Sequence, residues 1–139
     1  MKVYLCAPYA RRPEMQGVSE IMEAQGHIVT SRWVYSKGPI GTFADTAAEY
    51  ASNTDTCGRG ALRDFEDIRE ADTLIAFTDG ELARGGRHVE FGYAAALGKH
   101  LIVVGPRETL FHCLPFVEWL EDWPRFVTYL VEQAELIRS

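Results

Sequence analysis

The chain has 139 residues, 47% hydrophobic and 24% charged, which is typical of one globular domain with a single core, so we treat residues 1–139 as one domain. The formal net charge is −6 and there is no run of lysine or arginine, which argues against nucleic acid as the main partner. No stretch approaches the length of a membrane span, so we expect no membrane partner.

The three cysteines, Cys6, Cys57 and Cys113, are scattered and form neither a CxxC pair nor a zinc-binding spacing. Residues 1–7 have the pattern of a strand and lack the long apolar region and cleavage site of a signal peptide. We therefore expect reduced thiols, a cytoplasmic location, no metal site and no cofactor.

The start of the chain alternates strand and helix patterns. Residues 2–7 predict a first buried strand, residues 8–13 a loop, residues 14–25 a helix that Gly26 stops, and residues 27–33 a second strand. This order implies a parallel pair of strands with a right-handed crossover. The predicted inward face of the helix comprises Met15, Val18, Ile21 and Met22.

The middle of the chain predicts two helices and a strand. Residues 34–42 contain two glycines and a proline and predict a loop, residues 43–53 a short helix, and residues 54–60 a break. Residues 61–71 predict a second helix, and residues 72–78 a third strand. The predicted inward residues of this second helix are Leu62, Phe65 and Ile68.

The last third of the chain continues the alternation. Residues 101–105 are uniformly apolar, which predicts a fourth strand buried on both faces. Residues 106–115 are irregular, residues 116–123 predict a short last strand, and residues 124–137 predict a terminal helix with Pro124 in its first turn. Its predicted inward residues are Phe126, Val127, Leu130, Ala134 and Ile137.

This order predicts an α/β fold, a doubly wound (flavodoxin/Rossmann-like) three-layer sandwich with a mostly parallel sheet of about five strands. In such sheets, ligands bind beyond the carboxyl ends of the strands. The loops expected there are residues 8–12, 33–43, 79–86 and 105–112, and they are rich in Arg, Gly, His and aromatic residues.

Residues 83–99 stand out as a glycine-bounded helix that carries a lone glutamate. The pair Gly85-Gly86 fits a tight turn or an N-cap, and Gly98 fits the left-handed residue that closes a helix. Glu90 falls in the expected first turn among apolar neighbours. One interpretation is that Glu90 stabilises the helix dipole, by roughly 0.3–1 kcal/mol. The other is that its carboxylate lies at the mouth of a pocket, is kept anionic by the helix N-terminus and can act as a nucleophile. The expected apolar stripe is Val89, Tyr93 and Ala96, widened by Phe91, Ala94 and Ala95.

Three segments together resemble the nucleoside 2-deoxyribosyltransferase superfamily, which includes the related deoxynucleoside 5′-monophosphate N-glycosidases. The run Val-Tyr-Leu-Cys-Ala-Pro-Tyr at residues 3–9 resembles its first strand and loop. Residues 64–77 resemble its helix-then-strand segment, and residues 86–103 its Glu-x-Gly-x-Ala-x-x-x-Gly-Lys helix and following strand. The resemblance covers most of residues 1–105.

The resemblance implies cleavage of the N-glycosidic bond of a 2′-deoxynucleoside or deoxynucleotide. By motif position, Glu90 would attack the anomeric carbon and form a covalent sugar ester. Asp64 would contact the sugar hydroxyl and handle a proton near the base. The alternative interpretation is that Asp64 is an ordinary carboxylate on the helix surface. Tyr9 would contact the sugar or orient Glu90. The alternative interpretation is that Tyr9 is an aromatic residue that only lines the rim of the site.

The resemblance also places substrate contacts in two loops, Ala7, Pro8 and Arg11 after the first strand and Arg84, Gly85 and Gly86 before the helix. Some transferases carry a base-recognising aspartate at the position of Arg84. Arginine beside glycine-rich backbone suits a phosphate, although Arg84 and Arg87 are as easily read as solvated loop charges.

Two histidines complete the expected site. His88 lies beside the glutamate, where an ordinary exposed residue is the simpler reading. In related enzymes a residue after the fourth strand reaches into the site of the neighbouring subunit, and His112 is the candidate for that role here. The resemblance therefore implies a homodimer or higher homo-oligomer with a shared active site. Transfer of the deoxyribosyl group to another base is the first reading. Hydrolysis of nucleoside 5′-monophosphates is the alternative, and a non-catalytic nucleotide-binding module is the second alternative.

Overall fold

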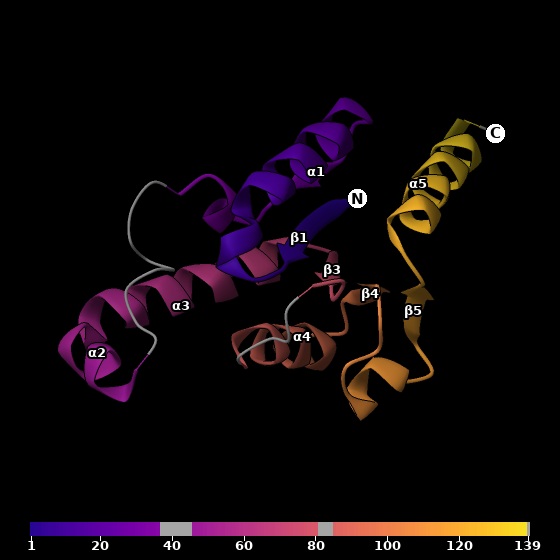
Figure 1. Ribbon diagram of the computed structural model, residues 1–139. Coiled ribbons are helices and arrows are strands. Elements are labelled where there is room, and N and C mark those ends of the chain that lie inside the picture. The colour runs from indigo at the N-terminus through magenta and orange to yellow at the C-terminus, as the bar shows by residue number, and fades with distance from the viewer. Residues whose placement is uncertain (37–45, 81–84, 139) are drawn as a thin grey trace.

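In the computed structural model, five strands form one sheet in the order β2-β1-β3-β4-β5, and every neighbouring pair is parallel. The structure describes residues 1–36, 46–80 and 85–138 (Figure 1). The strands are β1 (Lys2–Cys6), β2 (Ile28–Val29), β3 (Thr73–Phe77), β4 (His100–Val104) and β5 (Val117–Leu120). The predicted doubly wound α/β sandwich is confirmed.

Helices cover both faces of this sheet. They are α1 (Arg12–Ala24), α2 (Ala47–Ser52), α3 (Thr54–Glu70), α4 (Gly86–Ala96) and α5 (Trp123–Arg138). Short 3₁₀ turns lie at η1 (Tyr9–Arg11), η2 (Arg32–Val34) and η3 (Leu110–Cys113). Helices α1 and α5 pack on one face, and α3 and α4 pack on the other (Figure 1).

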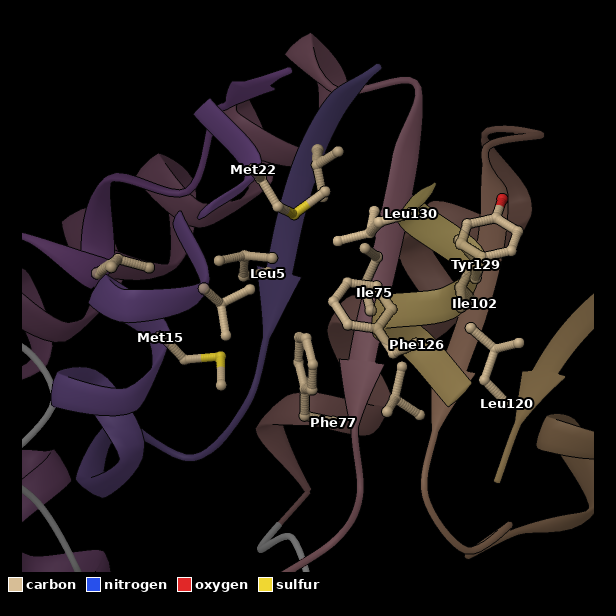
Figure 2. Close-up of a cluster of buried hydrophobic side chains, with 14 residues drawn as sticks. Leu5, Met15, Met22, Ile75, Phe77, Ile102, Leu120, Phe126, Tyr129 and Leu130 are labelled. Carbon is tan, nitrogen blue, oxygen red and sulfur yellow. The ribbon is translucent and has the colours of Figure 1, made fainter. Parts of the chain in front are cut away.

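The alternation of side chains along each strand divides the core in two. Leu5, Ile75 and Ile102 face α1 and α5, and Figure 2 shows them pointing toward Met15 of α1 and Phe126 of α5. The opposite face of the same strands carries Tyr4, Cys6, Leu74, Ala76, Leu101 and Val103 toward α3 and α4. A polar residue, Tyr4, therefore occupies the second core.

Several predicted boundaries are wrong. The expected break at residues 54–60 is helical, because α3 runs from Thr54 through Gly58 and Gly60. A helical glycine costs only about 1 kcal/mol relative to alanine, which packing of the longer helix can offset. The second strand shrinks to the two residues of β2, after which the chain turns and the Trp33 indole donates a hydrogen bond to the carbonyl of Leu5 at 2.8 Å.

Some predicted inward faces are rotated. Leu62 is 62% exposed and Val89 is 59% exposed, and Ile21, Val127 and Ile137 are also exposed. Helix α4 buries Arg87, Phe91 and Ala94 instead of the expected stripe. The cause is that α4 packs its 87-91-94 face on the sheet, so Val89 points away from it.

The exits of β3 and β4 lie close together. Gly105 follows β4 with φ of +117°, and a Cβ there would lie 2.6 Å from Oγ1 of Thr78. Because all strands are parallel, the segments that follow β1, β3 and β4 share this edge of the sheet. Within the described ranges, no helix combines the length and the apolar character needed to cross a membrane.

Candidate active site

Glu90 is held by the strand that lies beneath its helix. Gly85 caps α4 with φ of +119°, and Glu90 is the fifth residue of the helix, so it lies in the second turn and not the first. Its Oε2 accepts a hydrogen bond from the hydroxyl of Tyr4, and its Oε1 lies 3.9 Å from Sγ of Cys6. Residues 4 and 6 point to the same face of β1, so both donors approach from one strand.

Burial controls the ionisation of this glutamate. It raises the pKa of Glu90 from an ordinary 4.5 to about 8, with the charge of Asp64 acting in the same direction. The hydrogen bonds from Tyr4 and Cys6 lower that pKa but only partly offset the burial. The prediction that the helix N-terminus keeps Glu90 ionised is therefore wrong, because the carboxyl lies beyond the first turn and burial raises its pKa.

Asp64 is a second carboxyl with a shifted pKa. Helix α3 packs on α4 through Phe65 and Tyr93, whose rings stack with centroids 4.1 Å apart. Burial, followed by the charge of Asp67, raises the pKa of Asp64 to about 6. The charge of Asp64 acts on Glu90 and raises its pKa, as burial does.

Tyr4, and not Tyr9, contacts the glutamate. The Tyr4 side chain is fully buried, and burial and then the charge of Glu90 raise its pKa well above the ordinary value, so the phenol stays a donor. Tyr9 instead accepts a hydrogen bond from Nη1 of Arg12 at 2.6 Å, and its ring centroid lies 6.4 Å from that of Trp33. The sequence carried one signal that pointed to Tyr4, because a hydroxyl in a buried strand must find a partner.

The arginines near the strand exits differ in how far they are neutralised. Arg11 forms ion pairs with Glu14 and Asp79, both at 2.9 Å. Arg12 has no carboxylate partner in the described part of the chain and donates to the neutral Tyr9 hydroxyl and Ser36 carbonyl. Its guanidinium lies 5.0 Å from the centroid of the Tyr9 ring. Arg84, which the sequence favoured for phosphate, lies outside the described residues.

Arg87 is a buried ion-pair partner, not a solvated loop charge. It is 5% exposed, and its Nη2 lies 2.7 and 2.9 Å from the two carboxylate oxygens of Glu108. Its Nη1 donates to the carbonyl of Phe77 at the end of β3. This pair ties the first turn of α4 to the segments that follow β3 and β4.

His112 is 2% exposed and packs inside its own chain. Its Nδ1 accepts the backbone N–H of Glu108 at 2.9 Å, and its ring centroid lies 4.9 Å from Phe91 and 5.7 Å from His88. Burial lowers its pKa, followed by the effect of His88. The expectation that His112 reaches into a neighbouring subunit does not fit this placement, and His88 is partly buried beside it.

The remaining predicted contact residues lie after β1 and at the start of α4. Ala7 and Pro8 are partly buried directly after β1, and the Pro8 carbonyl accepts the N–H of Arg11 at 2.9 Å. Gly85 and Gly86 form the start of α4. Across residues 1–36, 46–80 and 85–138, no three His, Cys, Asp or Glu side chains group as metal ligands would.

Comparison with known proteins bears on the fold. No family model matches the chain, and no curated protein sequence matches it. Among solved structures, it is similar to the CMP N-glycosidase BcmB of Clostridium botulinum, with a TM-score of 0.56 and 21% identity over 96% of this chain and 98% of that one. The chain shares the fold of this N-glycosidase. At that identity the likeness extends to architecture alone.

Proposed function

We propose that the protein cleaves the N-glycosidic bond of a nucleoside or nucleotide, with Glu90 as the nucleophile. The observation that carries this proposal is the Glu90 carboxyl, which lies near the carboxyl end of β1, held by Tyr4 and electrostatically coupled to Asp64. Two carboxyls with pKa values of about 8 and about 6 suit acid–base and nucleophilic work on a glycosidic bond. The fold, shared with a CMP N-glycosidase, agrees with this chemistry.

In the proposed reaction, an oxygen of ionised Glu90 bonds to the anomeric carbon as the carbon–nitrogen bond to the base breaks. The electron pair of that bond leaves with the base, which takes up a proton at its nitrogen. Water then attacks the anomeric carbon, the ester bond to Glu90 breaks, and the water proton passes to a carboxylate. Asp64 is the candidate for the proton transfers and for contact with a sugar hydroxyl.

A nucleoside 5′-monophosphate is the favoured substrate class. Phosphate binding needs a cation whose charge is available, and Arg11 is already paired with two carboxylates. Arg12, with neutral partners only among the described residues, is the better candidate, and it adjoins the loop after β1. Hydrolysis therefore moves ahead of transfer of a deoxyribosyl group, which is the other outcome of the same ester when a second base replaces water.

The test is product analysis by chromatography. The protein is incubated with each nucleoside and 2′-deoxynucleoside and with their 5′-monophosphates, with and without a second free base. Free base and sugar phosphate from a monophosphate support the hydrolase, and a new nucleoside that requires added base supports the transferase. Glu90→Ala should abolish turnover, whereas the surface control Glu20→Ala should not. Equal turnover in both variants, or no turnover of any substrate by the wild-type protein, would overturn the proposal.

The phosphate assignment has its own variants. Arg12→Ala should raise KM for monophosphates by at least tenfold and leave nucleosides nearly unaffected, because a charge-assisted contact contributes on the order of 1.5–3 kcal/mol. Arg125→Ala, on the exposed surface of α5, is the matched control. Equal losses for nucleosides and monophosphates would remove Arg12 from phosphate binding.

A homo-oligomer remains part of the proposal. The segment between β4 and β5 exposes three large apolar side chains, Leu110, Phe111 and Phe116. Exposed apolar patches of this kind mark association surfaces. Light scattering should give the mass of at least a dimer, and Phe111→Asp combined with Phe116→Asp should reduce it to the monomer. A wild-type monomer at assay concentrations would remove the homo-oligomer from the proposal.

A further inference from the structure

His112 lies in a small polar cluster between α4 and the segment that follows β4. The ring is 2% exposed, and its centroid lies 4.9 Å from that of Phe91 and 5.7 Å from that of His88. The backbone N–H of Glu108 donates to its Nδ1 at 2.9 Å. Because Nδ1 accepts this bond, the neutral ring carries its proton on Nε2. The hydrogen bond therefore exists only while His112 is neutral.

The charges around His112 oppose its protonation. The Glu108 carboxylate favours a charged ring, but its two oxygens lie 2.7 and 2.9 Å from Nη2 of Arg87 and are already paired. From α4, His88 and Arg87 both disfavour a second positive charge at this point. Burial of the ring is the largest cause of its lowered pKa, followed by His88. Protonation would place an unpaired charge in the interior and turn Nδ1 into a donor that faces the donor N–H of Glu108.

The Glu108 N–H lies at a junction between two parts of the chain. The Glu108 side chain pairs with Arg87 in the first turn of α4, and the residues that follow lead into η3, which begins at Leu110. Leu110 and Phe111 expose their apolar side chains from this turn. His112 is the buried residue of η3, so its ring anchors the turn against α4.

We propose that His112 is a pH-sensitive switch, which holds η3 against α4 while the ring is neutral and releases it when the ring is protonated. The inference does not depend on the proposed reaction. The pKa of His112 is lowered from an ordinary 6.5, so the native state takes up this proton less readily than the unfolded chain. The stabilising contribution is therefore complete above pH 6.5, declines as the pH falls below 6.5, and is fully lost below the lowered pKa.

Amide hydrogen exchange tests this proposal, because it reports the opening of individual hydrogen bonds. After correction for the intrinsic pH dependence of exchange, the Glu108 N–H should exchange on the order of tenfold faster at pH 5 than at pH 7.5, the factor that corresponds to loss of one buried hydrogen bond. The N–H groups of His112 and Leu114, which donate to Thr109 and Phe111 within the same turn, should accelerate with it. Acceleration of the Glu108 N–H alone would overturn the release of η3.

Three variants assign the effect to His112. His112→Asn keeps an acceptor near the position of Nδ1 and does not titrate, so its Glu108 N–H should exchange equally fast at both pH values. His88→Asn removes a charge that lowers the pKa of His112, so the acceleration should begin at higher pH. His100→Asn is the matched control, since His100 is an exposed histidine at the start of β4 that pairs with Glu118, and it should respond as the wild type does.

The switch is overturned if the wild-type Glu108 N–H exchanges equally fast at both pH values, or if His112→Asn shows the wild-type acceleration. Should His112→Asn fail to fold, the nitrogen-15 chemical shifts of the His112 ring in the wild-type protein give its tautomer and protonation directly. The proton is expected on Nε2 at pH 7.5, and protonation of Nδ1 should accompany the faster exchange. Protonation without faster exchange would also overturn the switch. None of these measurements uses substrate, so their outcome is separate from that of Glu90→Ala.

Discussion

Tyr4→Phe removes the hydroxyl that donates a hydrogen bond to Oε2 of Glu90 and leaves the buried aromatic ring in place. A hydrogen bond to a charged group contributes about 1.5–3 kcal/mol, which corresponds to about 1–2 pKa units. Since the Tyr4 hydroxyl lowers the pKa of Glu90, its loss should raise that pKa from about 8 to the range of about 9–10. At pH 7 the ionised fraction of Glu90 would then fall about tenfold to hundredfold.

The assay is release of free base from the best monophosphate, followed from pH 5 to pH 10 by chromatography. The acid limb of kcat/KM should move upward in Tyr4→Phe, and turnover at pH 7 should fall by the same factor. The free energy of unfolding should fall by about 1 kcal/mol, because Oε2 of Glu90 loses its hydrogen-bond donor. A variant whose profile overlays that of the wild type would show that Tyr4 does not control the ionisation of the reacting group.

Three further changes test the electrostatics around the site. Asp64→Asn removes a charge that raises the pKa of Glu90, so the acid limb of the pH–rate profile should move downward. Glu90→Gln should raise Tm more at pH 9 than at pH 5. The pKa of Glu90 is raised from 4.5 to about 8 in the native state, so the wild-type protein loses stability as the pH rises through that range. Glutamine does not ionise, and the variant should not show this loss. Arg87→Met leaves the buried Glu108 carboxylate without its ion-pair partner, so the free energy of unfolding measured in urea should fall by about 3–5 kcal/mol. The double variant Arg87→Met with Glu108→Leu should restore most of that free energy.

For each of these three substitutions, one result would contradict the reasoning. An upward shift for Asp64→Asn would mean that Asp64 acts on Glu90 through structure and not through charge. A gain in Tm for Glu90→Gln that is equal at both pH values would mean that the pKa of Glu90 is not raised in the native state. A double variant as unstable as Arg87→Met alone would indicate that the guanidinium stabilises the fold through its contact with the Phe77 carbonyl.

The sequence predicted the architecture well, because strands buried on both faces produce unmistakable apolar runs. The alternation of patterns predicted a mostly parallel sheet of about five strands, and the sheet has five strands that are all parallel. Boundaries were less predictable where tertiary contacts overrode local preference. The glycines at 58 and 60 suggested a break, but they lie inside α3, and β2 is cut short where the chain turns toward the indole contact of Trp33.

The site was only partly predictable. Glu90 and Asp64 followed from the resemblance, and in the structure the charge of Asp64 raises the pKa of Glu90. Tyr4 was missed because period-two alternation marks it as core, and only its hydroxyl indicates otherwise. The pairing of Arg11 with Asp79 joins residues 68 positions apart, and no local pattern in the sequence reports it.

The placement of the first strand in the interior of the sheet has a consequence for folding kinetics. Lys2 at the start of β1 donates its N–H to Asp72, 70 residues away, and Tyr4 meets Glu90 across 86 residues. During synthesis, β1 is made long before β3, its inner neighbour in the sheet, and α4, the helix that carries Glu90. Folding dominated by such distant pairings is slow. Recovery of catalysis after dilution from denaturant should therefore lag behind recovery of helical signal, and enzyme activity becomes a late reporter of completed folding.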